Sequence, residues 1–170
     1  LRDGSLLFFE IETGKLFPLH HLPAGQSWTV LWSPDGEWLM SSIYYSLGLF
    51  VVNTATQETL TLVNAEEYSS LSAWSPDNQY LAYGQGTWND MTRVFDSSIL
   101  LWNTDSRTSQ LLIPEIQTKS QPIWTPDGTQ LVIGHLTNED QTLALSLIDI
   151  NTGQMTTLWQ SSSIDPSLSV

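Results

Sequence analysis

The side chains that could carry out catalysis are present in this sequence, but their spacing does not form a catalytic motif. Ser, His and Asp all occur, yet there is no Gly-x-Ser-x-Gly elbow, no glycine-rich phosphate loop and no His-Glu-x-x-His pair. Two acids could serve in glycoside hydrolysis, but no pair stands out by its position. We therefore expect a domain without catalytic residues and without a cofactor.

The histidines and acids also argue against a metal centre. His20 and His21 are adjacent, and adjacent residues on a strand point to opposite faces, so they would not readily bind one ion together. The chain has no cysteine, which excludes disulfides and thiolate zinc sites. Acidic loops could hold calcium, but no EF-hand spacing occurs, and a solvated acidic rim is the simpler interpretation. We expect no metal site.

The charge balance restricts the class of partner. Five basic residues stand against 18 acidic ones, for a net charge of −13. This balance argues against binding to nucleic acid backbones and to anionic membrane surfaces. No apolar run approaches the roughly 20 residues that span a bilayer. We expect a protein or peptide partner, and the composition, with 41% hydrophobic residues, supports a packed core.

A repeated turn sequence organises the chain. Trp-Ser/Thr-Pro-Asp-Gly/Asn occurs at 32–36, 74–78 and 124–128, and an Asn-Thr pair follows each copy, at Asn53, Asn103 and Asn151. Glu12-Thr13-Gly14 resembles the last of these turns. Asn53 and Asn103 each precede the next repeat Trp by 21 residues, whereas the distance from Trp to Asn varies between 21 and 29. One half of the repeat therefore has a constant length, and the other half accepts insertions.

Each half-repeat has the pattern of a β-hairpin. Pro presets the turn, and Gly or Asn tolerates the left-handed conformation that closes it. No segment shows a sustained helical period, so only strands are predicted. The four strands of each repeat are expected at 28–32, 38–44, 49–52 and 59–63; at 70–74, 80–84, 99–102 and 110–113; and at 120–124, 130–134, 144–150 and 155–159.

Four short antiparallel strands every 42 to 50 residues are typical of the blade of a β-propeller. An immunoglobulin-like sandwich is the alternative all-β fold, but it does not predict a recurring turn sequence. The prediction is one partial β-propeller domain, 1–170, with about three full blades and a half blade. The expected parts are a half blade at 1–20, blades at 28–63, 70–113 and 120–159, and the start of another blade at 165–170.

The spacing also predicts that the repeat continues. The next repeat Trp would fall near position 172, just past Val170, so we expect a fragment of a longer protein. A complete small protein that closes by dimerising is the alternative.

These Ser-Pro-Asp-Gly turns resemble those of the TolB-like, WD-related propeller repeats, and the resemblance covers nearly the whole chain. The Gly-His and Trp-Asp signature of the best-known WD repeats is absent. Members of such families include periplasmic partner-binding proteins and the gating propellers of serine peptidases. The resemblance therefore implies a scaffold for binding, and it favours a periplasmic or extracellular location.

The topology predicts where binding occurs. In an up-and-down sheet the repeated turns lie at one end and the variable connections at the other, and variable loops on a rigid scaffold commonly bind partners. The longest connection runs from about Gln85 to Ser97. The predicted binding residues are Trp88, Asp90, Arg93, Phe95, Tyr68, Glu67 and His135, with Glu66, His20, His21, Glu139 and Asp140 on the same face.

Two aromatic residues leave two interpretations open. Trp88 and Phe95 could anchor a partner, since aromatics dominate binding interfaces, or they could fold back to cover the insertion. The repeat residues Trp32, Trp74 and Trp124 are expected to pack between blades, and Asp35, Asp77 and Asp127 to serve the turns.

The function that follows is a non-catalytic β-propeller module for protein binding or scaffolding through its variable-loop face. One alternative is an accessory, substrate-gating propeller of a prolyl-oligopeptidase-like serine peptidase. Another is the propeller sensor domain of a regulator.

Overall fold

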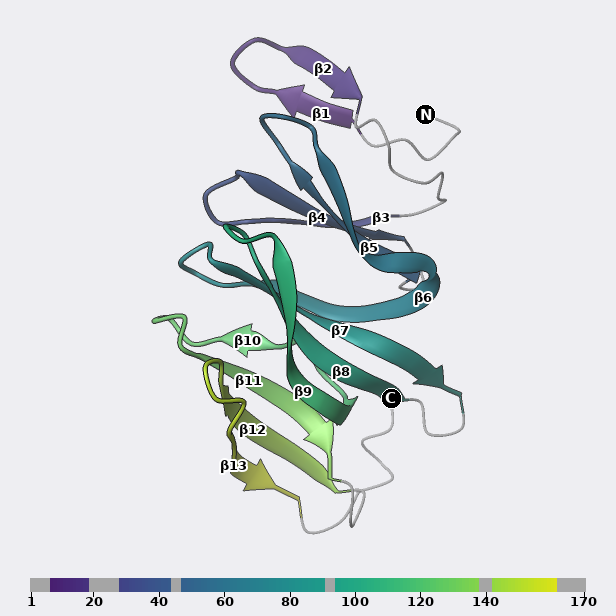
Figure 1. Cartoon of the computed structure of the whole chain (residues 1–170), viewed down its shortest axis with the longest axis vertical. Helices are drawn as coiled ribbons and strands as arrows, with labels where there is room; N and C mark the ends of the chain where they lie inside the picture. Colours follow the sequence, from purple (N-terminus) through teal and green to yellow (C-terminus); the bar gives the residue numbers. More distant parts are fainter. Residues whose placement is uncertain (1–6, 19–27, 44–46, 91–93, 138–141, 162–170) are drawn as a thin grey trace. The chain divides into compact units, whose positions relative to one another are not determined.

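The computed structural model describes residues 7–18, 28–43, 47–90, 94–137 and 142–161, and none of these lies in a helix. The chain divides into two compact units, Leu1–Ser69 and Ser70–Val170, and each is described here by itself. Strands β1 and β2 form a two-stranded antiparallel sheet, and β3 to β13 form an 11-stranded sheet, in which β10 pairs only with β11 (Figure 1). The predicted all-β fold class is thus confirmed.

The first unit contains a separate hairpin followed by a meander. The hairpin is β1 (Leu7–Glu10) paired with β2 (Lys15–Pro18). The meander consists of β3 (Trp28–Trp32), β4 (Trp38–Ile43), β5 (Leu47–Asn53) and β6 (Thr59–Trp74), each paired with the next. Strand β6 continues into the second unit.

The second unit contains two further sets of antiparallel strands. After the end of β6, the chain forms β7 (Tyr80–Asn89), β8 (Val94–Asn103) and β9 (Thr108–Thr118). The last set is β10 (Ile123–Trp124), β11 (Gln130–Leu136), β12 (Leu143–Asp149) and β13 (Met155–Gln160).

The strands lie where the repeat predicts them, but the junctions between repeats differ from the prediction. In β6 the fourth strand of the first repeat runs without interruption into the first strand of the second. In the third repeat the predicted strand 120–124 is reduced to β10, because the end of β9 takes over the pairing, with Thr118 opposite His135 of β11. The propensity of a short segment does not reveal this continuation, because it depends on which neighbouring strand offers hydrogen bonds.

The repeated turn is held by the same hydrogen bonds in all three copies. In the second copy the Ser75 hydroxyl donates to the Asp77 carboxylate at 2.6 Å and accepts from the Tyr80 N–H at 2.9 Å. Asp77 also accepts from the Gln79 N–H at 3.1 Å, and Asn78 closes the turn with a φ of 64°. The corresponding bonds join Ser33, Asp35, Glu37 and Trp38, and Thr125, Asp127, Thr129 and Gln130. The three aspartates are therefore turn residues, as predicted.

The second landmark of the repeat is not the one that the sequence suggests. Asn53 and Asn103 end their strands, and each side-chain oxygen accepts bonds from the two N–H groups two and three residues later. In the third copy this role belongs to Asp149, which accepts from Asn151 and Thr152. The alignment of Asn151 with Asn53 is thus wrong by two residues, because carboxylate and amide oxygens serve this turn equally well. The position that the 21-residue spacing predicts for the next repeat Trp moves by the same two residues, from 172 to 170, where the sequence has Val170, outside the described residues.

The core of the second unit lies between its two sets of strands. Ala82, Ile99 and Leu101, on β7 and β8, pack with Leu131 and Ile148, on β11 and β12, and each of these side chains is completely enclosed. Trp124 stacks on Tyr80 with 6.4 Å between ring centroids and donates its indole N–H to the Ala73 carbonyl. In the first unit, Trp32 contacts Phe8 of the hairpin at 5.3 Å. These two repeat tryptophans therefore pack against the preceding strands, as predicted.

Candidate functional site

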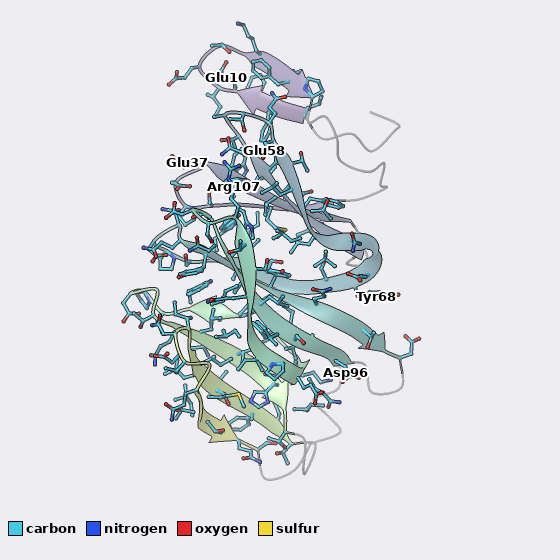
Figure 2. The ribbon with its side chains drawn as sticks, in the orientation of Figure 1. Glu10, Glu37, Glu58, Tyr68, Asp96 and Arg107 are labelled. Carbon is cyan, nitrogen blue, oxygen red and sulfur yellow. The ribbon has the colours of Figure 1, made fainter. Side chains whose placement is uncertain are left out.

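Within each unit the labelled residues of the repeated turns lie at one end of the strands (Figure 2). In the first unit, Glu37 and Glu58 mark the turns at one end, and Tyr68 lies at the other. In the second unit, Arg107 marks the β8–β9 turn and Asp96 lies toward the far end of β8. In both units the described turn residues therefore lie at the end of the strands away from Tyr68 and Asp96.

The longest connection is a hairpin rather than a loop. Strands β7 and β8 stay paired from Tyr80 opposite Asn103 to Asn89 opposite Val94. The connection predicted from about Gln85 to Ser97 is therefore mostly strand, because residues 85–89 pair with 94–98 and their backbone groups satisfy one another. Regular β-structure therefore accommodates the polar composition of this segment.

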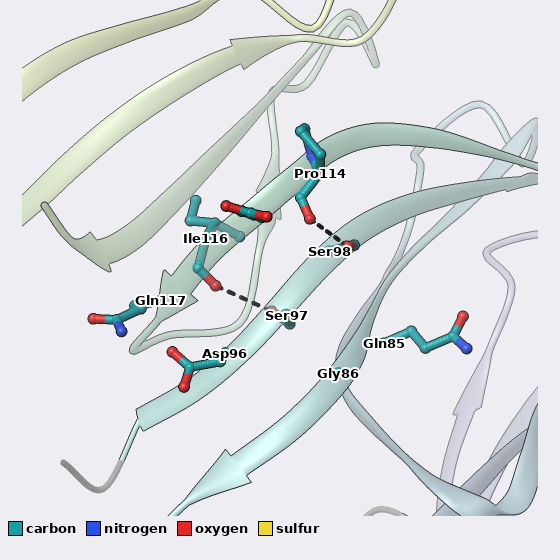
Figure 3. A pocket seen from close by; sticks show the side chains of 9 residues that line it. Gln85, Gly86, Asp96, Ser97, Ser98, Pro114, Ile116 and Gln117 are labelled. Carbon is teal, nitrogen blue, oxygen red and sulfur yellow. Dashed lines mark hydrogen bonds between the residues drawn. The ribbon is translucent and has the colours of Figure 1, made fainter. Parts of the chain in front are cut away.

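A polar groove lies beside the base of this hairpin (Figure 3). Its volume is about 500 Å³, within the range of small-ligand sites. Strands β7, β8 and β9 supply the lining: Gln85, Gly86, Asp96, Ser97, Ser98, Pro114, Glu115, Ile116 and Gln117.

An irregularity of β9 shapes the groove. Ser97 pairs with Ile116 and Ile99 pairs with Ile113, so Pro114 and Glu115 stand opposite the single residue Ser98. Such a bulge bends the strand and re-aims its side chains. The Ser98 hydroxyl donates to the Pro114 carbonyl and the Ser97 hydroxyl to the Ile116 carbonyl, and these bonds fix the bulged backbone (Figure 3).

Gly86 permits the close approach of β7 and β8 at the groove. A Cβ atom on Gly86 would lie 2.0 Å from the carbonyl oxygen of Asp96 and 2.6 Å from the Cα of Ser97. No side chain fits at that distance from a neighbouring backbone. Gly86 therefore serves the packing of the two strands, as glycine does where backbones meet closely.

The lining offers hydrogen-bond acceptors and negative charge. Asp96 and Glu115 contribute carboxylates, and among the described residues no Lys, Arg or His lines the groove. The side-chain oxygen of Gln117 is enclosed and has no hydrogen-bond partner within the described part of the chain. A ligand segment that carries N–H donors or positive charge matches this lining best.

Of the residues predicted for binding, Trp88, Asp90 and Phe95 lie in the β7–β8 hairpin. Trp88 and Phe95 lie opposite each other in the hairpin, and Asp90 is exposed at its tip. The side chains of Trp88 and Phe95 are outside the described set, as is the whole of Arg93, so both interpretations of the aromatics stay open. Asp90 and the two aromatics thus belong to the same extension as the groove.

Three other predicted residues do not join this groove. Glu67 and Tyr68 lie in β6 within the first unit, where both are exposed. His135 was expected in a connection, but it lies within β11 and is only 4% exposed. Its ring nitrogens contact the Leu136 carbonyl at 3.1 Å and the Ser146 hydroxyl at 2.9 Å. The predicted loop position of His135 is wrong because β11 continues two residues further along β12 than expected.

The sequence alone does not predict the groove, and most residues of its lining carry no motif. Gln85 lies in the connection that the sequence predicts for binding, whereas Glu115 and Gln117 lie between the predicted strands 110–113 and 120–124, where no site is predicted, because a groove made by a bulge has no local signature. The proline at 114, after a strand of apolar residues, was the one available signal, since proline is confined to edges and bulges of sheets.

The described residues contain no group of three or more His, Asp or Glu side chains that could hold a metal ion. His20, His21, Glu139 and Asp140 lie outside the described residues. No helix capable of crossing a membrane occurs in the segments that the structure describes. The acids of the repeated turns have a defined structural role: hydrogen bonds from the Thr125 hydroxyl and from Thr129 lower the pKa of Asp127, and those from Thr152 lower the pKa of Asp149.

Comparison with known proteins identifies the fold. No protein-family model and no curated protein sequence matches the chain. Among solved structures it is similar to TolB from Acinetobacter baumannii, with 15% identity, a TM-score of 0.59, and coverage of 93% of this chain and 38% of that one. Dipeptidyl peptidase 4 from Porphyromonas gingivalis has 12% identity and a TM-score of 0.71, with coverage of 92% and 28%. A putative TolB from Agrobacterium tumefaciens has 16% identity and a TM-score of 0.59, with coverage of 92% and 60%.

These similarities show that the chain has a β-propeller fold of four-stranded antiparallel blades, of the kind found in TolB. They provide no evidence for a WD-type repeat specifically. The chain spans between 28% and 60% of the length of these three structures. The class is therefore a partial β-propeller module.

Proposed function

We propose that this chain is a non-catalytic β-propeller module that binds a protein partner through the β7–β8 hairpin and the groove at its base. The observation that carries the proposal is the groove itself, whose described lining combines two carboxylates with several other acceptors and includes no basic side chain. The partner segment that fits is a peptide with exposed Lys or Arg side chains. The net charge of −13 supports the same choice, because it attracts cationic partners over distance.

The test is a selection from a library of random peptides against the immobilised chain. The wild type is expected to enrich Lys- and Arg-containing peptides. The double variant Asp96→Asn, Glu115→Gln keeps the shape of the groove and removes its charge, so it is expected to lose at least tenfold in affinity for the enriched peptides. Asp105→Asn is the matched control, because it removes one exposed carboxylate at the opposite end of the same strands. Equal binding by the double variant and the wild type would exclude the groove.

The two aromatics are tested separately. Trp88→Ala and Phe95→Ala lower the affinity for the same peptides if these residues anchor the partner. If they cover the hairpin instead, the stability of the chain falls and the affinity of the folded fraction is unchanged.

A second candidate function is an accessory propeller that gates the substrate of a serine peptidase. It is supported by the similarity to the Porphyromonas gingivalis dipeptidyl peptidase 4, whose TM-score of 0.71 is the highest of the three compared structures. The discriminating observation is the coding sequence downstream of Val170. A Gly-x-Ser-x-Gly elbow in a hydrolase-type continuation would favour this function, and further blades followed by a stop codon would favour the binding module.

A further inference from the structure

The polar side chains of the groove lie on one face of the sheet formed by β7, β8 and β9. Side chains that are opposite each other in an antiparallel pair share a face, and so do side chains two residues apart on one strand. Gln85 pairs with Ser98, and Asp96 pairs with Gln117, beside which it lies in Figure 3. Because Asp96 and Ser98 are two residues apart on β8, all four side chains share the groove face. The lining therefore follows the direction of the strands.

The two carboxylates of the groove are separated by one two-residue step along these strands. Gln117 is opposite Asp96, and Glu115 lies two residues before Gln117 on β9. A strand rises about 3.4 Å per residue, so this step is roughly 7 Å, and the Cα atoms of such diagonal neighbours lie about 7–8 Å apart. Asp96 is half-buried and Glu115 is exposed. A cationic group from solution can therefore approach each carboxylate.

The uncharged part of the lining suits a segment with unpaired backbone groups. The amides of Gln85 and Gln117 carry both donors and acceptors. Among the described lining residues, only Pro114 and Ile116 have apolar side chains, and Ile116 is buried. A helix satisfies its own backbone and docks through an apolar face, whereas an extended segment brings N–H and C=O groups that need partners. The lining therefore fits an extended segment better than a helix.

We propose that the groove recognises an extended segment with two basic side chains separated by one residue. This specificity rests on the proposed function and narrows its partner to one spacing of charge. Alternate side chains of an extended segment share a face and lie about 7 Å apart, whereas adjacent side chains point to opposite faces. One basic side chain therefore meets Asp96 while the other meets Glu115.

Three labelled peptides of identical composition test the spacing. Each contains two lysines among serines, placed adjacent, one residue apart as Lys-Ser-Lys, or four positions apart, and fluorescence anisotropy at physiological ionic strength gives the affinities. The Lys-Ser-Lys peptide is expected to bind about fivefold more tightly than either isomer, because a partly exposed ion pair contributes up to about this factor.

The outcomes separate this spacing from the proposed function. Equal affinity for the three peptides, or a preference for either isomer, overturns the spacing and leaves a cation-binding groove. Equal binding of all three by the wild type and by the double variant Asp96→Asn, Glu115→Gln overturns the proposed function, because the groove carboxylates then have no part in binding.

A double-mutant cycle tests whether each lysine meets its own carboxylate. Asp96→Asn and Glu115→Gln are each measured with the Lys-Ser-Lys peptide and with its two versions in which one lysine is replaced by glutamine. Loss of a lysine is expected to cost about fivefold in the wild type and nothing further in the variant that lacks its carboxylate. Equal coupling of both lysines to both carboxylates overturns the paired arrangement.

Asp105→Asn is the matched control, because it removes an exposed carboxylate from the β8–β9 turn. This variant is expected to keep the order of the three peptides, and a changed order would assign the preference to overall charge and overturn the proposal. Both groove substitutions keep the size of the side chain at positions that are not buried, so the variants should fold. Thermal melts that coincide with that of the wild type check this.

Discussion

Replacing Gly86 with alanine tests the close approach of β7 and β8 on which the groove depends. The added methyl group would lie 2.0 Å from the Asp96 carbonyl oxygen and 2.6 Å from Ser97 Cα. Non-bonded carbon atoms attract each other at about 3.5 to 4.0 Å, so β8 has to retreat by roughly 1 Å or more. The obstructing atoms belong to a backbone that is paired with both β7 and β9, so they cannot move aside as a flexible side chain could.

The expected cost follows from this geometry. Overpacking of a well-packed site costs about 1–3 kcal/mol, and the upper part of that range applies where the obstacle is backbone. Alanine also restricts the unfolded chain, which offsets about 0.4–1 kcal/mol. The net expectation is a destabilisation of about 2 kcal/mol, which lowers the melting temperature of a chain of this size by roughly 4–8 °C.

Urea unfolding followed by tryptophan fluorescence, together with thermal melts, measures this effect. Gly36→Ala is the control, because a Cβ there meets nothing within 4 Å and the only penalty comes from its φ of 75°. Gly36→Ala should lose about 1 kcal/mol and leave peptide binding at the groove intact. Gly86→Ala should lose more stability and should also weaken binding. An unchanged urea midpoint for Gly86→Ala would refute the steric argument.

Three further results are expected. The pKa values of Asp127 and Asp149 lie below the ordinary 3.8 because of their threonine hydrogen bonds. The ionised carboxylates therefore stabilise the folded chain fully above a pH of about 3.8, and this stabilisation is lost as the pH falls through the lower pKa values of the folded state. Thermal melts over this acid range would show the loss. Asp149→Asn should keep the stability measured at neutral pH and reduce this acid loss, whereas Asn151→Ala should hardly change the urea midpoint. A larger loss of stability for Asn151→Ala than for Asp149→Asn would restore the alignment of Asn151 with Asn53. Trp124→Phe keeps the ring contact but loses the indole hydrogen bond to a backbone carbonyl, and the urea midpoint should report a loss of about 1 kcal/mol.

The sequence by itself determined the class of fold and most of its strands. Pro fixes a backbone dihedral angle, Gly and Asn accept the left-handed region, and the Ser hydroxyl bonds the Asp carboxylate two residues later. The Ser-Pro-Asp-Gly pattern therefore forms its turn through interactions within these few residues. The alternation of apolar residues then assigns the flanking strands. These effects act over a few residues, and a single sequence shows them directly.

Only the tertiary structure decided which residues share a surface. The equivalence of Asp149 with Asn103 rests on the strand register, and so does the pairing that makes a hairpin of residues 85–98. The groove exists because Pro114 and Glu115 are opposite one residue of the neighbouring strand. Hydrogen bonds between strands far apart in the sequence set the register, the hairpin and the groove, and the residue types along one strand do not specify which strand it pairs with.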